Sequence, residues 1–453
     1  MRMKIASRHL SFADSDLTRR NSWFRSRSLC RLIAGLGLII FQSSPTLRAQ
    51  EPLHLTIEQA YQLAKTNYPL IRQQDLIRKT RDYSVENAAK GYLPALYFSG
   101  QATYQSAVTD FPSKISIPGF GLPAFSKDQY KIYGEVDQVV YDGGQIHNQK
   151  ETAVANESIQ QKSLQVDLYS LYDRVNQLFF GVLLMEEQLR QNELLKKDLQ
   201  DGIDKAKAQV ANGTAYRSSV DELQAQLLQA EQSRVEEEAN RKAFLQMLGQ
   251  FVNHTFDENI ILEKPASPAM EDSIHRPELQ LYDYQKKAYD LQDESLNIAL
   301  RPKFSFFLQG GYARPGLNFL SNNFAFYYIG GLRMNWNLGS WYTLKNQRLI
   351  LDLDRKTLDV QKETFLFNTI LSQKQENTEI RKYSDLIKTD NQIIALRTSV
   401  KNAASAQLEN GVLDAHEYLS HVNAEDVSRR LLILHQMELL LAQYNYQYIT
   451  GNH

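Results

Sequence analysis

Side chains that could do acid–base, nucleophilic or metal chemistry are present in this sequence, but they form no catalytic pattern. There is no His-Glu-x-x-His, no phosphate-binding glycine loop and no Gly-x-Ser-x-Gly. His416 and His421 are five residues apart, which places them on different faces of a helix. His435 lies in an apolar stretch that is more typical of a core or an interface. We therefore predict no catalytic residue, no metal site and no cofactor.

The first 49 residues have the composition of a targeting segment. Basic residues precede an apolar stretch from Leu32 to Phe41, and a small-residue cleavage pattern follows at residues 47–49. The apolar stretch is too short for a transmembrane helix, which needs about 20 residues. We interpret residues 1–49 as a signal peptide; a short buried helix is the alternative. The only cysteine, Cys30, lies in this segment, so the mature chain is expected to have no thiol.

The charge of the remaining chain is acidic. Without residues 1–49 it has 42 basic and 50 acidic residues, a net charge of −8. This balance argues against nucleic acid as a partner, because such binding depends on basic residues that neutralise phosphates. It fits equally a solvated surface or a duct that repels anions.

A six-residue motif occurs twice and indicates an internal duplication. Ala-Gln-x-x-Asn-Gly spans residues 208–213 and again 406–411, 198 residues later. Each copy ends a long stretch without proline, a residue that costs about 3 kcal/mol inside a helix. We predict helices over 145–211 and 344–409, each about 100 Å long. Glycine after asparagine favours the left-handed conformation that closes a helix, so tight turns and return helices are expected after each.

The first long segment carries a regular apolar seam. Its residues follow alternating steps of four and three, which predicts a coiled-coil-like neighbour. They are Leu164, Leu168, Leu171, Val175, Leu178, Val182, Met185 and Leu189. The second long segment is less regular, and its packing partner is not predicted.

Two strand candidates precede each long helix. Apolar and polar residues alternate with a period of two over about 93–107, 129–140, 301–313 and 324–338. Such lengths fit strands that cross a bilayer at a tilt, with apolar side chains toward lipid and polar ones toward a lumen. The residues expected to face the lumen are Lys131, Glu135, Asp137, Arg333, Asn335 and Asn337. A soluble sandwich with one solvated face is the alternative.

Four strands cannot close a membrane barrel, and an open sheet edge is not tolerated in lipid. Strands that cross a membrane would therefore be shared between chains, and three chains would give twelve strands. The rival interpretation is a trimeric coiled-coil surface protein of the adhesin type. Such proteins use one barrel-forming segment per chain, whereas the order of strands, helix, turn and helix occurs twice here.

The chain resembles the TolC family of outer-membrane efflux proteins over essentially all of the segment after residue 49. Thr56 and Gln59 form a capping-box pattern in a segment similar to the family's opening helix. The other motifs that carry the resemblance are Gly91-Tyr92-Leu93-Pro94, Leu300-Arg301-Pro302, Val139-Val140-Tyr141-Asp142-Gly143-Gly144 and His275-Arg276-Pro277-Glu278-Leu279. They are similar to the starts of the strands, the strand-to-helix junction and the start of the second repeat.

The resemblance implies a mainly α-helical fold with a small β part. Three chains would form a twelve-stranded transmembrane β-barrel, with four strands per chain, continued by a long α-helical barrel in the periplasm of a Gram-negative bacterium. The homotrimer would be the outer-membrane exit duct of a tripartite efflux or type I secretion system. It would conduct substrates passively when docked to a periplasmic adaptor (membrane fusion protein) and an inner-membrane transporter. Residues 50–250 would be the first repeat, 251–273 a linker and 274–453 the second repeat.

The resemblance also implies roles for residues at the two turns, 212–214 and 410–412. The predicted periplasmic tips and adaptor contacts are Asn212, Gly213, Thr214, Asn410, Gly411 and Val412. The family's closing acidic residues lie six and nine positions after the second tip glycine, at Glu417 and Ser420 here, and only Glu417 keeps a carboxylate. The family's tip arginine is replaced by Leu413. A solvated glutamate on a helix surface is the alternative for Glu417.

Overall fold

The structure, a computed structural model, describes residues 54–108, 126–256 and 260–453. The expected signal peptide and a small part of the expected linker lie outside these ranges. The described elements pack as one unit. None of its helices is both long and apolar enough to cross a membrane.

Each repeat contains a helix, two strands, a long helical segment and a return helix. The elements of the first repeat are β1 His54–Leu55, α1 Ile57–Asn67, α2 Gln73–Ala89, β2 Ala95–Tyr104, β3 Asp128–Tyr141, α3 Gln145–Tyr169, α4 Leu171–Ala211 and α5 Arg217–Val252. Those that follow are β4 Ile261–Leu262, α6 Pro277–Ala299, β5 Lys303–Arg314, β6 Ala325–Asn335, α7 Ser340–Glu409 and α8 Ala415–Thr450. The capping box at Thr56 and Gln59 is present at the start of α1.

The predicted continuous helix over 145–211 is wrong at one point, because the segment divides at Ser170 into α3 and α4. The Ser170 hydroxyl donates to the Asp167 carbonyl (2.8 Å), a local bond that competes with the helical pattern. The adjacent Tyr169 ring stacks on Tyr448, with centroids 5.1 Å apart. The interruption therefore lies where this segment is tied to α8. In contrast, α7 is continuous over 70 residues and begins before the predicted start.

The buried face of α4 is wider than the predicted seam. Leu178 and Met185, two seam residues, are only half-buried, whereas Phe179, Phe180 and Leu183 are buried outside the seam. The reason is that α4 contacts α1, α5, α7 and α8 and not a single partner helix. The heptad pattern thus predicts the helix but not the number of its neighbours.

The four long strands form one antiparallel sheet in the order β2-β3-β5-β6. Glu135 of β3 lies opposite Tyr97 of β2 and Gln309 of β5, and Gln309 lies opposite Ile329 of β6. In this register the odd-numbered residues of all four strands share one face, up to an irregularity near Val139. β2 and β6 are the two edges of the sheet.

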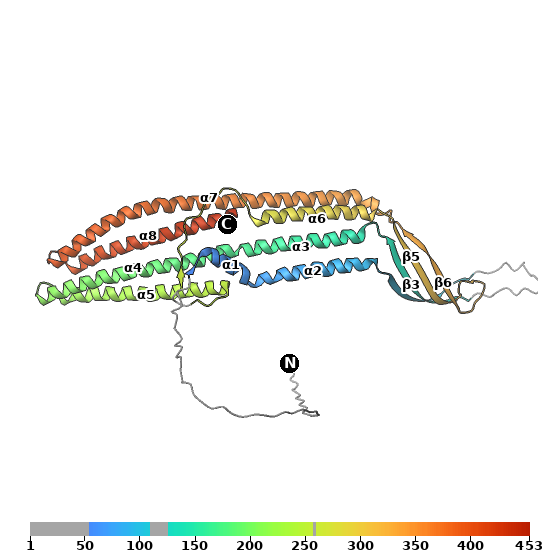
Figure 1. The fold of residues 1–453 in the computed structure, drawn as a ribbon, viewed down its shortest axis with the longest axis horizontal. Helices are drawn as coiled ribbons and strands as arrows, with labels where there is room; N and C mark the ends of the chain where they lie inside the picture. Colours follow the sequence, from blue (N-terminus) through green and yellow to red (C-terminus); the bar gives the residue numbers. More distant parts are fainter. Residues whose placement is uncertain (1–53, 109–125, 257–259) are drawn as a thin grey trace, which may run out of the picture. The chain divides into compact units, whose positions relative to one another are not determined.

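The helices next to the sheet repeat the order of the strands (Figure 1). α2 contacts α3, α3 contacts α6, and α6 contacts the first part of α7. The two orders agree because α2 leads into β2, β3 leads into α3, α6 leads into β5 and β6 leads into α7. Toward the other end, α4, α5, α8 and the rest of α7 pack together, and the two tight turns lie at the far end (Figure 1).

Ion pairs align α6 with α7, the partner that the sequence pattern does not predict. Lys362 lies 2.9 Å from Asp283, and Arg355 lies 3.0 Å from Asp290. The spacing is seven residues on both helices, so the pairs lie along one face. Exposed ion pairs add little stability. We infer that their main effect is to fix the register of the two antiparallel helices.

An apolar cluster holds the tip end together, and we call it the tip core. It combines residues from α4, α5, α7 and α8. Its most buried members are Leu199, Ile203, Ala206, Leu223, Leu408 and Val422. A second core lies around α1, and a short parallel pair of β1 with β4, not predicted from the sequence, joins the opening segment to the linker.

Candidate functional site

The sheet has a polar face, formed by the odd-numbered residues of its strands. Five of the six residues predicted to line a lumen lie on it: Lys131, Glu135, Asp137, Arg333 and Asn335. Asn337 does not, because β6 ends at Asn335. The Asn337 side chain instead accepts a hydrogen bond from the Gly339 N–H (3.1 Å), just before α7.

An arginine crosses this face from one strand to another. Arg333 of β6 reaches over β5 and donates to Glu135 and Asp137 of β3, each at 2.8 Å. Its guanidinium lies over the Phe307 ring of β5, 4.4 Å from the centroid. Gln309 also donates to Glu135 (3.0 Å). The two carboxylates are therefore fixed on the polar face by charge-assisted bonds.

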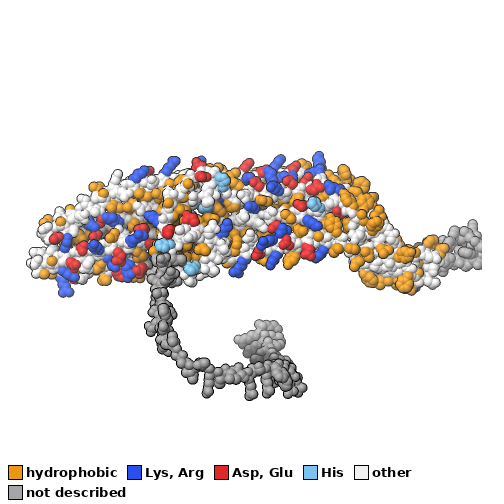
Figure 2. Space-filling view, viewed as in Figure 1, with side chains coloured by type: hydrophobic (Ala, Val, Ile, Leu, Met, Phe, Trp, Pro, Cys, Tyr) orange, Lys and Arg blue, Asp and Glu red, His pale blue; other side chains and the backbone are white. Residues whose placement is uncertain are grey.

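The opposite face of the sheet is apolar and exposed. Phe98, Phe326 and Tyr328 are 79%, 87% and 80% exposed. Hydrophobic side chains gather over the sheet, whereas the helices carry mixed charges (Figure 2). Soluble proteins rarely expose large contiguous apolar patches. Together the two faces have the alternation of a strand with lipid on one side and water on the other.

The two turns between the long helices and their return helices have the same geometry. Gly213 and Gly411 have φ of +74° and +69°, which favours glycine. In each turn the glycine N–H donates to the carbonyl three residues earlier, and the next N–H donates to the carbonyl five residues earlier, at 2.9–3.1 Å. This is the Schellman closure of a helix. A Cβ at either glycine would meet nothing within 4 Å, so there is open space beside both turns.

The segment after the second turn differs from that after the first. Asp414 caps α8 by accepting the Glu417 N–H (2.8 Å), whereas α5 begins without a side-chain cap. Glu417 and Ser420 are exposed and three residues apart, so they lie on one side of the helix. Leu413 packs against the tip core. An apolar contact thus stands at the position where the resemblance to the TolC family implies an arginine.

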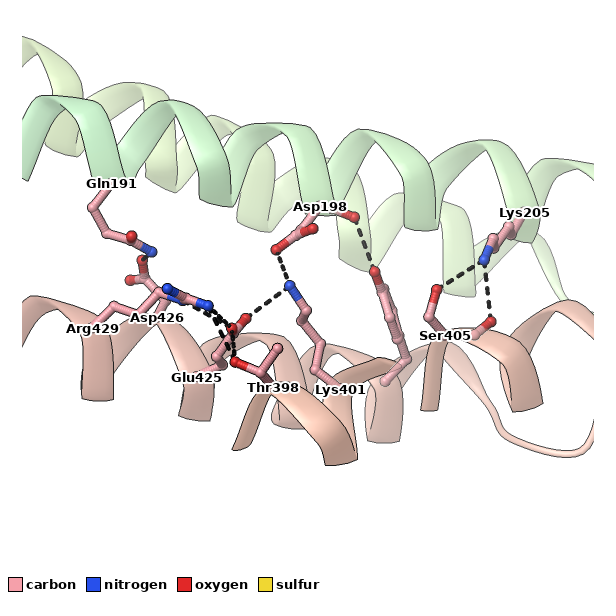
Figure 3. A network of polar contacts seen from close by, with 10 residues as sticks. Gln191, Asp198, Lys205, Thr398, Lys401, Ser405, Glu425, Asp426 and Arg429 are labelled. Carbon is pink, nitrogen blue, oxygen red and sulfur yellow. Dashed lines mark hydrogen bonds and ion pairs between the residues drawn. The ribbon is translucent and has the colours of Figure 1, made fainter. Parts of the chain in front are cut away.

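A buried polar network links α4, α7 and α8 close to the tip core (Figure 3). Lys401 lies 2.7 Å from Asp198 and 2.8 Å from Glu425. Glu425 is 3% exposed and also accepts bonds from Thr398 (2.6 Å) and Arg429 (2.7 Å). These contacts join the helical hairpin of the first repeat to that of the second.

A second cluster extends the same junction to α5. Arg430 lies 2.8 Å from Asp426 and 2.5 Å from Glu237 of α5. Gln191 of α4 donates to Asp426 (3.0 Å). All four helices of the tip end are therefore joined by polar contacts between residues distant in the sequence.

The charges of this network follow from the balance between burial and hydrogen bonding. Burial alone would raise the pKa of Glu425, but bonds from Lys401, Thr398 and Arg429 lower that pKa below its ordinary value. Burial would lower the pKa of Lys401, but its bonds to Asp198 and Glu425 raise it. Both groups are charged at neutral pH, so the junction is ionic.

The sequence analysis did not single out this network, although a signal was present. Tyr418, Val422, Glu425 and Arg429 follow one another in steps of four, three and four. The two charged residues thus occupy positions of a helical seam at which apolar residues are expected. Within the described residues, no group of three or more His, Cys, Asp or Glu side chains is placed to hold a metal ion.

The sheet with one polar and one apolar face, continued by long helices that end in paired tips, defines the fold of a TolC-like channel subunit. Residues 60–254 match the family model described as Outer membrane efflux protein. The family match and the fold confirm the predicted resemblance to the TolC family. They also support an outer-membrane location with an extension into the periplasm, and a transport role that is not enzymatic.

Solved channel structures have the same fold. CusC is similar with a TM-score of 0.64 and 13% identity, over 88% of this chain and 92% of that chain. VceC from Vibrio cholerae has a TM-score of 0.61 and 13% identity, over 87% and 96%. The open state of MtrE from Neisseria gonorrhoeae has a TM-score of 0.60 and 12% identity, over 87% and 88%. A search of curated proteins found no match.

Proposed function

We propose that three copies of this chain form a passive exit duct, with their sheets joined into one barrel in the outer membrane. The observation that carries this proposal is a sheet with one exposed apolar face and one polar face, whose edges β2 and β6 pair with no further strand of the described residues. An open edge in lipid leaves backbone groups without partners, so β6 of one copy must pair with β2 of the next. Three four-stranded sheets then close as twelve strands.

The helices support the same closure. In the order α2-α3-α6-α7, the outer members are α2 and α7, which continue the edge strands. Leu353 and Phe367 of α7 are exposed, as are Leu76 and Tyr83 of α2. When β6 pairs with β2 of the next copy, α7 lies beside α2 of that copy. The apolar side chains at both edges would then be covered.

Purified protein in detergent and in planar lipid bilayers tests this proposal. We expect trimers that appear by electron microscopy as tapered hollow cylinders, and that conduct ions across the bilayer. Monomers, or trimers that appear as solid rods and do not conduct, would contradict the proposal and favour the adhesin-type rival.

We further propose that Glu417 controls closure of the periplasmic end. Three copies at a constriction would repel one another, with a strength set by local screening, and this would favour opening or a bound cation. Glu417→Ala is therefore expected to change the single-channel conductance or its block by divalent cations. Ser420→Ala, which removes no charge from the same side of the helix, serves as the control. Identical currents in the wild type and Glu417→Ala would rule out this role.

The two turns are proposed to dock a periplasmic adaptor, which connects the duct to an inner-membrane transporter. Gly411→Glu or Gly213→Glu would place a charged side chain in open space at a tip and should abolish efflux-dependent drug resistance. Asparagine tolerates positive φ, so Gly411→Asn should keep the turn and most of the efflux. Trimers should remain in the membrane in all variants. Normal resistance with both glutamate variants would refute tip docking.

A further inference from the structure

Apart from Lys303 at the junction with the helices, the charged strand residues of the polar face form two groups at different depths. Glu135 and Asp137, with Arg333, lie toward the helices. Lys131 lies toward the other end of the same strand. Four to six residues separate the groups, or roughly 13–20 Å at about 3.3 Å per residue. This separation exceeds the screening length of about 8 Å at physiological salt, so each group sets its own local potential.

The group near the helices is acidic. Glu135 and Asp137 are largely buried against the sheet, whereas Arg333 is 41% exposed. Two carboxylates share one guanidinium, so each chain contributes a formal net charge of −1 here. Lys303 shares this face, but its ammonium contacts Gln145 of α3, at the junction with the helices. We call Glu135, Asp137 and Arg333 the acidic band.

The outer group is basic. The Lys131 ammonium lies over the rings of Tyr133 and Tyr327, 4.5 and 5.4 Å from their centroids. Gly311 leaves space for Tyr133, because a Cβ there would lie 2.6 Å from the Tyr133 Cβ. The two rings thus hold the cation on the polar face without a carboxylate partner among the ion pairs of the described residues. We call Lys131 with its two rings the basic band.

We propose that these two bands make the barrel wall selective for the charge of the solute that passes it. This inference rests on the proposed function, because only a closed trimer turns the polar face into a lumen. Three copies would place about −3 at the acidic band and +3 at the basic band. Arg333 is the specificity-determining residue, since it halves the carboxylate charge and so limits the retention of cationic solutes. The basic band, at the end of the barrel away from the helices, then favours anionic solutes.

Thiol labelling of full-length trimers reads the potential at each band directly. Cys30→Ser removes the one native thiol from all variants. A cysteine is then placed at Ala95, opposite Asp137, or at Gln101, opposite Lys131. Each is treated with methanethiosulfonates that carry a trimethylammonium or a sulfonate group. We compare the rate with the trimethylammonium reagent, divided by the rate with the sulfonate reagent, at the two positions. At low salt this ratio should be at least about threefold higher at Ala95→Cys than at Gln101→Cys. The difference should shrink at 1 M salt, where the screening length is about 3 Å.

Variants that change the charge of each band test whether the bands cause the difference in labelling ratio between the two positions. Arg333→Gln should raise the cation preference at Ala95→Cys, and Arg333→Lys should not. Lys131→Gln should raise the cation preference at Gln101→Cys. This variant keeps the ion pairs of Arg333 with Glu135 and Asp137, so it still tests the inference if Arg333→Gln does not assemble. Equal rate ratios at both positions, or ratios that neither Arg333→Gln nor Lys131→Gln changes, would overturn the inference.

A lipid-side cysteine separates failure of this inference from failure of the proposed function. Phe98→Cys lies on the apolar face and should be protected from both charged reagents in membranes. Free reaction at this position would contradict the barrel itself. Protection of Phe98→Cys combined with equal ratios at the two lumen positions would contradict only the charge bands.

Discussion

Replacing Lys401 with methionine is expected to destabilise the tip end by about 3 kcal/mol. Methionine keeps an unbranched apolar stem but removes the ammonium that lies between Asp198 and Glu425. Glu425 is buried, and a buried carboxylate that loses its partner costs far more than an exposed ion pair contributes. Arg429 and Thr398 still contact Glu425, so the chain should fold while the junction between its two hairpins weakens.

Hydrogen exchange of the α7 and α8 amides in purified trimers measures this loss. Lys388→Met is the matched control, because Lys388 is on the same helix and forms an exposed pair with Asp385 at 2.9 Å. Its loss should cost less than about 0.5 kcal/mol. The double variant Lys401→Met with Glu425→Gln should recover part of the protection, since the buried charge is gone. Equal exchange in Lys401→Met and Lys388→Met would show that the network does not stabilise the junction.

Acid should weaken the same junction. The folded pKa of Glu425 lies below its ordinary value of 4.5, so its stabilising contribution is present above that value and is lost as the pH falls through the folded pKa. Exchange in α7 and α8 should therefore increase below about pH 4.5, relative to Glu425→Gln at the same pH. Lys401 contributes no change in this range, because its raised pKa lies at alkaline pH. The same acid dependence in the wild type and in Glu425→Gln would contradict the assignment to Glu425.

The local features of this fold are predictable because each depends on a few neighbouring residues. The alternation around Phe326 and Tyr328 specifies a strand with two different faces, whatever the strand pairs with. Gly213 and Gly411 specify turns because few other residues adopt a positive φ. Strands, turns and long helices therefore follow from the sequence, and so does the duplication that they share.

The contacts between distant segments are not predictable in this way. Lys401 and Asp198 are 203 positions apart, and no periodicity in either segment specifies the partner of the other. The division at Ser170 lies beside a contact between distant segments, the stacking of Tyr169 on Tyr448, which the local sequence does not specify. The end of β6 at Asn335 is also not specified by the local sequence, since the alternation of apolar and polar residues continues to Leu338. The polar junction at the tip is thus a product of packing between the repeats.

Gly311→Ala is expected to reduce the yield of assembled trimers severely. A Cβ at position 311 would lie 2.4 Å from the Ile132 carbonyl oxygen and 2.6 Å from the Tyr133 Cβ. These atoms belong to the paired strand and cannot rotate away, so β3 and β5 would have to separate and lose ladder hydrogen bonds. Overpacking of this kind costs about 1–3 kcal/mol per chain. In a barrel shared by three chains the cost recurs in each copy.

The neighbouring glycine provides the control for this prediction. Gly310→Ala adds the same methyl group one residue earlier, on the apolar face, where the nearest atom is the Tyr327 carbonyl oxygen at 4.0 Å. It should assemble normally, as measured by the fraction of heat-resistant trimer on semi-denaturing gels. The two variants have the same composition and the same loss of backbone freedom in the unfolded chain. A lower yield of Gly311→Ala alone is therefore expected from the close approach of β3 to β5 at this register, and equal yields would contradict that close approach.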